Sequence, residues 1–334
     1  MNIWIPSNKW IEANDELKAP MPKLAGYVRC VLRNSDGSIA QDTGWMKNMI
    51  VSGGFYRYMP NGPTSPYPSY AQVGSNATAP AFTQTTCITP LSTWENLTAG
   101  GLGFTDGASP YNWRNYEYRF AAGNGTGTIA EIAFNNSSNG AHPIARCLIV
   151  DGGGSPTTIV KGVNQVLDVT YQQRCYIPMV DVTGVVAVAG VNYDYTMRPL
   201  NIDDTYWHWS GIASKMSWSS SGSFYSAYTG TLVTRYQDQN NITGSLGTLN
   251  YDSEFYATIY EYGNYGAYDY SWKGEFQAGL DYWNSQVRTV VVRPWGTGSL
   301  WQCQFDSQVT GLGIPKTGDQ LLRLRFQFGM DQYP

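Results

Sequence analysis

The chain has 334 residues, a formal net charge of −4 and 14% charged residues, against about 25% in an average soluble domain. It has no basic run that could follow a phosphate backbone, so we expect no nucleic-acid partner. No stretch approaches ~18 apolar residues, and the N-terminus lacks a basic segment followed by an apolar one. We therefore expect neither membrane insertion nor a secretory signal.

The length exceeds the usual size of one hydrophobic core and predicts two domains of roughly 150 residues each. Five cysteines are scattered singly, at positions 30, 87, 147, 175 and 303. Their number is odd and no Cys-x-x-Cys spacing occurs, so we expect buried free thiols and no zinc site. No phosphate-loop or dinucleotide motif is present either, and we expect no cofactor.

The first 20 residues read as an N-terminal arm, a short polar segment that contains Trp4 and Trp10. Such an arm cannot bury two tryptophans alone. It would pack on its own domain or dock into a partner, and we favour docking into a particle through these two side chains.

Beyond the arm, helix signals are nearly absent, and short alternating runs broken by glycine, asparagine, aspartate and proline predict strands throughout. Hairpins are predicted at 27–42 and around Gly190. Segment 166–175 alternates apolar and polar residues with a period of two, which predicts a strand with one buried face. Segment 320–329 alternates Leu and Phe with Arg and Gln, and a slip of one residue would put its arginines in the core.

Segments 158–174 and 313–329 resemble each other at one constant offset, with Ile159 aligned to Ile314 (314 − 159 = 155). Matched pairs include Lys161 with Lys316, Leu167 with Leu322 and Tyr171 with Phe326. Weaker matches relate 120–123 to 276–279 and 129–134 to 287–292. A run of matches at one offset indicates an internal duplication. We therefore predict an all-β chain of two related antiparallel β-sandwich domains, 21–180 and 181–334, preceded by the arm 1–20.

Catalytic patterns are weak. Neither of the two histidines, His142 and His208, lies in a pattern that predicts a catalytic triad. A glycosidase needs only two carboxylates roughly 5–9.5 Å apart. The acidic residues that lie among aromatic residues are Asp203, Asp204, Glu254, Glu261, Asp269 and Asp281. No pair of them stands out by spacing, so we interpret them as solvated turn residues and expect no enzyme.

Aromatic residues are abundant, with 12 tryptophans and 25 tyrosines. Many would pack within sheets, but the Gly, Ser and Asn spacers in 205–275 indicate exposed loops. Exposed aromatic rings make protein contacts or carbohydrate platforms. The residues predicted to contact other subunits or a glycan are Trp207, Trp209, Trp218, Tyr225, Tyr262, Tyr265 and Trp272.

Several glycine-rich segments follow one another in a fixed order. They read "TGWMKNMIVSGGF", "YAQVGSNATAPAFTQTT", "YRFAAGNGTGTIAEIAF", then the stretch 145–178, and finally "IPKTGDQLLRLRFQFG". This order resembles a family of tailed-bacteriophage virion proteins described as tail fibre or minor structural proteins. The resemblance covers most of 25–200 and the C-terminal strand, and it leaves 200–300 unmatched. The usual Asn-Leu-Ile-like step of the family reads Asn48-Met49-Ile50 in this chain.

The resemblance implies a non-enzymatic component of a phage particle, attached to the tail, neck or capsid. A virion protein is made in the bacterial cytoplasm and works outside it, which fits a chain with unpaired cysteines and no secretory signal. We expect other virion proteins as partners, together with copies of the chain itself, since virion components are symmetric. Two alternatives stay open: a receptor-binding tail fibre module that recognises host surface glycans through 205–275, and a polysaccharide depolymerase.

Overall fold

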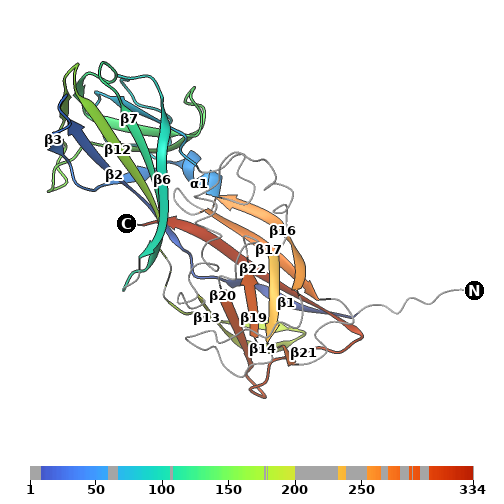
Figure 1. Cartoon of the computed structure of the whole chain (residues 1–334). Helices are drawn as coiled ribbons and strands as arrows, with labels where there is room; N and C mark the ends of the chain where they lie inside the picture. The colour runs from blue at the N-terminus through green and yellow to red at the C-terminus, as the bar shows by residue number, and fades with distance from the viewer. Residues whose placement is uncertain are drawn as a thin grey trace, which may run out of the picture.

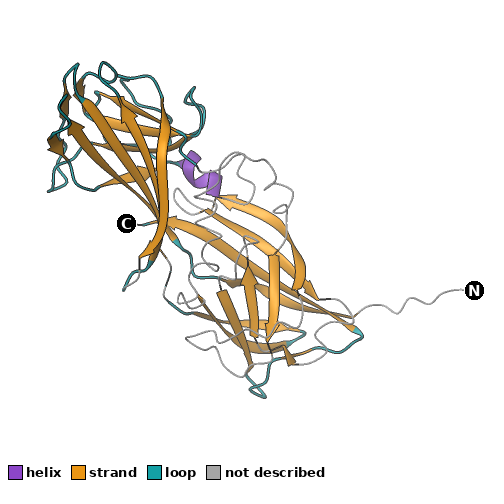
Figure 2. Ribbon diagram, in the orientation of Figure 1, coloured by secondary structure: helices purple, strands orange, loops and turns teal. Residues whose placement is uncertain are grey.

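The computed structural model describes residues 9–58, 67–105, 108–176, 178, 180–199, 232–237, 254–264, 270–278, 286–287, 289–293 and 301–333. Strands dominate this part of the chain, and α1 (Ser52–Tyr58) is the one helix within it (Figure 2). The prediction of an all-β chain is therefore confirmed. Within the same ranges, no helix is long and apolar enough to cross a membrane.

Eight strands of the N-terminal half form a closed ring of antiparallel neighbours, which we call the first ring (blue to green in Figure 1). They are β2 (Lys23–Arg33), β4 (Met46–Ile50), β5 (Tyr70–Gly74), β6 (Glu95–Thr105), β7 (Tyr111–Phe120), β9 (Glu131–Asn135), β10 (Pro143–Leu148) and β12 (Val166–Tyr176). Around the ring the order is β2, β12, β7, β6, β5, β9, β10, β4 and again β2.

Three short strands and the helix complete this half. Strand β3 (Ile39–Asp42) extends the sheet beside β2, and β8 (Gly127–Ile129) pairs with β11 (Ile159–Lys161). Helix α1 begins directly after β4 and lies beside β10, where the amide of Val51 donates to the carbonyl of Ile144.

The alternation in 166–175 places one face of β12 inside the first ring, as predicted. Leu167, Val169 and Tyr171 are buried, whereas Asp168 and Thr170 on the opposite face are partly exposed. Inward rings from neighbouring strands fill the same core, and the rings of Phe134 and Tyr171 stack with centroids 4.3 Å apart. Burial of such apolar faces is the main stabilising term for this half of the fold.

Nine strands form a second closed ring, which we call the second ring. They are β1 (Lys9–Lys18), β13 (Val182–Val188), β14 (Val191–Pro199), β15 (Leu232–Gln237), β16 (Glu254–Asn264), β17 (Tyr270–Ala278), β19 (Thr289–Arg293), β20 (Trp301–Ser307) and β22 (Gln320–Gln332). The order is β1, β22, β17, β16, β15, β19, β20, β14, β13 and again β1. Two short strands, β18 (Gln286–Val287) and β21 (Ile314–Pro315), pair with each other.

The second ring repeats the strand order of the first, with β1 added. In chain order, β2, β4, β5, β6, β7, β9, β10 and β12 occupy the positions of β13, β14, β15, β16, β17, β19, β20 and β22. The short pairs correspond as well, because Ile129 lies opposite Ile159 and Val287 lies opposite Ile314, with all four side chains fully buried. Where β2 pairs directly with β12, β1 lies between β13 and β22.

The expected pair of β-sandwiches needs correction. In the first ring, β4 joins β2 to β10, and β6 joins β7 to β5, so the two faces are connected along both sides and form a closed barrel. Short alternating strands predict buried faces but carry no information on whether two sheets share their corner strands.

The expected separate arm also needs correction for residues 9–18. These residues form β1, which pairs in parallel with β22 and buries Ile11, Ala13 and Leu17. Its apolar alternating side chains fill the core of the chain's own second ring. Residues 1–8 lie outside the described part.

Candidate functional site

The N-terminal segment and β22 run side by side and parallel, from one ring to the other. Within the second ring, Lys9–Lys18 pair with Gln320–Gln327, with one irregularity in the register. At the first ring, Lys23 and Leu24 of β2 pair with the end of β22. We call 9–24 and 320–333 together the terminal ladder. In Figure 1, β22 starts in the second ring and ends at the base of β2 and β12.

Backbone hydrogen bonds continue the ladder across the junction between the rings. They run from Ala19 N to Gln327 O (3.0 Å), from Asp331 N to Pro22 O (3.1 Å) and from Tyr333 N to Leu24 O (2.8 Å). Since β2 belongs to the first ring and β22 to the second, the ladder adds main-chain hydrogen bonds to the covalent connections that lead from β1 to β2 and from β12 to β13.

Side chains of the first ring contact Tyr333, the residue that follows β22. We call these side chains and Tyr333 together the junction cluster, which comprises Tyr27, Lys47, Tyr111, Arg174, Tyr176 and Tyr333. The rings of Tyr176 and Tyr333 stack with centroids 3.9 Å apart and 19° between their planes. Nζ of Lys47 lies 5.7 Å from the centroid of the Tyr333 ring. Stacking and cation–π contacts of this kind contribute about 0.5–1.5 kcal/mol each.

Arg174 lies at the centre of the junction cluster. Its guanidinium carbon is 3.8 Å from the centroid of the Tyr27 ring and 4.7 Å from that of Tyr111. The hydroxyls of Tyr27 and Tyr176 are 3.3 Å apart. Burial, together with this hydrogen bond, raises the pKa of Tyr27 to about 12, so its hydroxyl keeps its proton above about pH 10, where an ordinary tyrosine ionises. In the junction cluster, aromatic rings pack against the Arg174 guanidinium and against the ring of Tyr333. Sequence analysis did not identify this cluster, because its members come from distant segments.

Trp10, a predicted docking residue, lies on β1 at the edge of the terminal ladder. Its side chain is 41% exposed, and the guanidinium carbon of Arg323 lies 4.1 Å from its ring centroid. Arg323 Nη1 also donates to Glu12 at 3.0 Å. The indole thus contacts its own chain on one side, and its docking to a particle stays a prediction.

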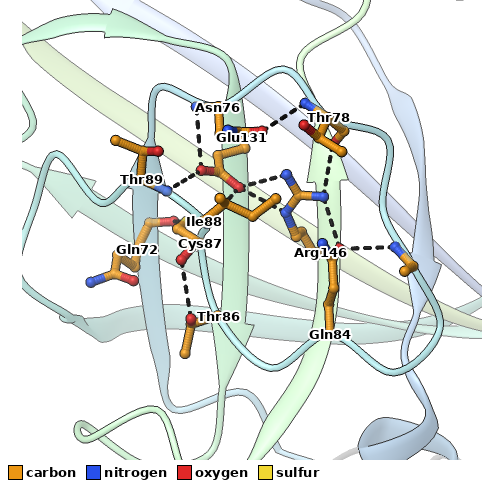
Figure 3. Close-up of polar contacts among 11 residues, drawn as sticks. Gln72, Asn76, Thr78, Gln84, Thr86, Cys87, Ile88, Thr89, Glu131 and Arg146 are labelled. Atoms are coloured by element: carbon orange, nitrogen blue, oxygen red, sulfur yellow. Dashed lines mark hydrogen bonds and ion pairs between the residues drawn. The ribbon is translucent and has the colours of Figure 1, made fainter.

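A buried ion pair orders the long connection between β5 and β6. Arg146 Nη2 and Glu131 Oε2 are 2.7 Å apart, with side-chain exposures of 2% and 0% (Figure 3). Glu131 also accepts backbone N–H bonds from the loop residues Asn76, Ile88 and Thr89 at 3.0–3.3 Å. The carboxylate of one strand thereby fixes two separate parts of the loop.

Arg146 holds the same loop from its other side. Its Nη1 donates to the carbonyl of Thr78 and to Oε1 of Gln84, each at 2.9 Å (Figure 3). Sequence analysis missed the pair, because Glu131 and Arg146 lie on different strands and no spacing rule relates them. Both charged groups contact only the chain itself in the described residues, through the ion pair and the bonds to the loop, which is the geometry of a structural anchor.

A more exposed ion-pair group lies on the outer face of the first ring. Asp168 accepts from Arg119 Nε at 2.7 Å and from Arg33 Nε at 2.8 Å. Burial acts to raise the pKa of Asp168, but the hydrogen bonds and charges of the two guanidinium groups outweigh it and lower the pKa below its usual value. These three residues join β2, β12 and β7 across their outward face.

Most predicted contact residues lie outside the described ranges: Trp4, Trp207, Trp209, Trp218, Tyr225 and Tyr265. Tyr262 and Trp272 lie opposite each other on the paired strands β16 and β17. The structure therefore brings these two positions together. Their proposed contact with a subunit or a glycan stays a prediction.

The residues considered for catalysis are likewise divided. Glu254 and Glu261 lie on β16, whereas His208, Asp203, Asp204, Asp269 and Asp281 lie outside the described part. His142 lies in the turn before β10, where its amide donates to Asn135 Oδ1 at 3.0 Å. In the described ranges, no group of three or more His, Cys, Asp or Glu side chains is placed to hold a metal ion. All five cysteines are buried and unpaired, as predicted.

Comparison of the chain with models of protein families, with curated proteins and with solved structures gives no match. Function is therefore argued from the geometry above.

Proposed function

We propose that this chain is a non-enzymatic structural component of a bacteriophage virion, associated with the tail, neck or another appendage. It is made in the host bacterial cytoplasm and contacts copies of itself and other virion proteins. In this role the two rings act as one stiff spacer, and the remaining surfaces make the particle contacts.

The terminal ladder is the observation that carries this proposal. A chain whose two halves only needed to fold would require one covalent connection between them. Here main-chain bonds and the junction cluster tie the end of β22 to β2 and to the segment before it, so residues 19–24 and 327–333 both reinforce the junction. Domains joined by a small interface move relative to each other by default, and a backbone ladder opposes that motion. A structural spacer needs stiffness between its domains, whereas an enzyme that works by hinge motion lacks it.

We also propose that the two rings derive from one ancestral ring by internal duplication, with domains at 21–180 and 181–334. The shared strand order and the corresponding buried pairs Ile129–Ile159 and Val287–Ile314 support this. Duplication of a folded unit lengthens a spacer, because the second copy already has a sequence that forms a packed core. Strand β1 is then an addition that closes the second ring.

The cysteines support assembly in a reducing compartment. Burial raises the pKa of Cys147 to about 12 and that of Cys30 well above its usual value, so neither forms a reactive thiolate at neutral pH. Free buried thiols are usual in cytosolic proteins, and a protein exported through an oxidising compartment more often carries disulfides.

The test is the composition of purified particles. Particles of the parent phage are compared with particles from a phage that lacks the gene, using quantitative peptide mass spectrometry. We expect peptides of this chain at a fixed copy number per particle in the first sample. Recovery of the chain only from the host lysate, with none in washed particles, would contradict the proposal.

A further inference from the structure

The outer half of β6 has a backbone edge that no described strand covers. On one side, β6 pairs with β7 from Leu97 to Thr105. On the other side, its pairing with β5 ends at Asn96, and the last bond there runs from Leu97 N to Ser69 O at 2.9 Å. The N–H and C=O groups of 98–105 that face away from β7 therefore form an edge without a strand partner in the described part of the chain.

From Ala99 to Thr105 this edge lacks the charges and prolines that protect many edge strands, and its one register irregularity lies at its start, between Leu97 and Ala99. Residues 98–105 read "TAGGLGFT", with no charged residue and no proline. Residues 98–102 are exposed, and Leu102 is 50% exposed. Natural proteins usually place charges, prolines or bulges on such edges, because an uncharged exposed edge pairs with other strands.

Gly101 is a glycine that the isolated chain does not require. A Cβ added there meets no atom within 4 Å, and its backbone is not in the left-handed region. Its neighbours differ, because a Cβ on Gly100 would lie 2.8 Å from the carbonyl of Asn115 and one on Gly103 would lie 2.5 Å from the Trp113 ring. The open space around Gly101 leaves room for a second backbone to approach this edge closely, which is one of the uses of a glycine within a strand.

We infer that the free edge of β6 pairs with the same edge of a second copy of this chain, antiparallel about a two-fold axis at Gly101. This inference rests on the proposed function, which calls for contacts between copies, and it assigns one of them. In a two-fold contact the same patch must complement itself. An uncharged edge meets this condition, since no like charges face each other across the axis.

The register follows from strand geometry. Only alternate residues direct their N–H and C=O groups toward one edge, so self-pairing places residue i opposite residue j with i + j even. Centred on Gly101, Gly100 faces Leu102 of the second copy and Ala99 faces Gly103. Both of these pairs contain a glycine, so no two bulky side chains face each other beside the axis.

The test uses opposite charges at the axis. Gly101→Glu and Gly101→Lys each place two like charges face to face in a pair of identical copies. We expect each variant alone to associate at least about tenfold more weakly than the wild type in low salt, by light scattering after size-exclusion chromatography. An equimolar mixture of the two variants should regain wild-type association, because Glu then faces Lys. Circular dichroism confirms that each variant is folded.

Gly152→Glu and Gly152→Lys are the matched controls, because Gly152 is an exposed turn glycine that also has open space around it and an ordinary backbone. They should associate as the wild type does. The inference is wrong if the wild type is monomeric at high micromolar concentration, if the Gly101 variants keep the wild-type mass, or if the mixture fails to restore it. The last two results would contradict this pairing but not the proposed role of the chain in a particle. That role is tested separately by the mass spectrometry of purified particles.

Discussion

Glu131 and Arg146 carry opposite charges in a site that water does not reach. Moving such charges out of water costs several kcal/mol each, and only good geometry with further hydrogen bonds offsets this cost. Here the loop supplies those bonds from Asn76, Ile88 and Thr89 to the carboxylate. These hydrogen bonds hold the loop over the ion pair, and they offset part of the cost of burying the carboxylate.

Replacement of Glu131 by glutamine should destabilise the chain by about 3–5 kcal/mol, because Arg146 would remain buried without a counter-charge. Urea unfolding followed by fluorescence gives this difference from the midpoint and slope. A loss below about 1 kcal/mol would mean that the pair does not anchor the loop as described.

The control is Asp168→Asn, which removes a more exposed acid from Arg33 and Arg119. The free energy of unfolding should fall by no more than about 1 kcal/mol at pH 7.

The pKa of Asp168 is lowered in the folded chain, so the stability that its carboxylate contributes is present above the unfolded pKa of about 4 and is lost as the pH falls further. The difference between variant and wild type should therefore shrink in acid.

At the scale of elements, β1 is the strand that distinguishes the second ring from the first. Leu17 is fully buried and lies opposite Phe326 in the parallel ladder with β22. Its side chain fills the second ring from a strand that precedes the first ring in sequence. The stability of the second ring should therefore depend on the N-terminus of the chain.

Leu17→Ala should lower the free energy of unfolding by about 2–5 kcal/mol, through lost apolar burial and the cavity left behind. Trp10→Ala on the same strand is the comparison. It removes a half-exposed ring and one contact with Arg323, and should cost only about 1 kcal/mol. Equal effects of the two substitutions, measured by urea unfolding, would show that β1 does not fill the core.

Sequence periodicity predicted which faces of the strands are buried but not which strands are neighbours. Leu322, Leu324, Phe326 and Phe328 are all buried, as their alternation with polar residues predicted. The same alternation carries no information about partners, so it could not place β1 beside β22 or close the rings. Pairing of this kind joins residues far apart in sequence, such as Glu12 and Arg323.

The buried Glu131–Arg146 ion pair and the junction cluster could not be predicted from the sequence, for a related reason. Glu131 is the one charged residue of the apolar stretch 129–134, and an acidic residue normally faces solvent. Its burial depends on Arg146 and on a loop folded over it. Similarly, Tyr333 gains its role only when β22 reaches Tyr176 of the first ring. The predicted aromatic contacts of 205–275 lie mostly outside the described residues and stay predictions.

At the scale of the whole molecule, the terminal ladder joins the two rings by main-chain hydrogen bonds. In chain order, the described residues run through β1 of the second ring, then through the first ring, then through the rest of the second ring, and end against the first ring (Figure 1). The segment 19–22 and the end of β22 therefore both lie across the junction between the rings. A free edge on β6 of the first ring then offers a place where one copy of the chain meets the next.

The most direct test is a cryo-EM reconstruction of the parent phage particle with this chain traced in the density. We predict that the chain is present in symmetry-related copies, with both rings in the relative orientation of Figure 1 in every copy and β22 seated on β2. Absence of the chain from the particle, or rings that take different relative orientations from copy to copy, would contradict a stiff structural spacer.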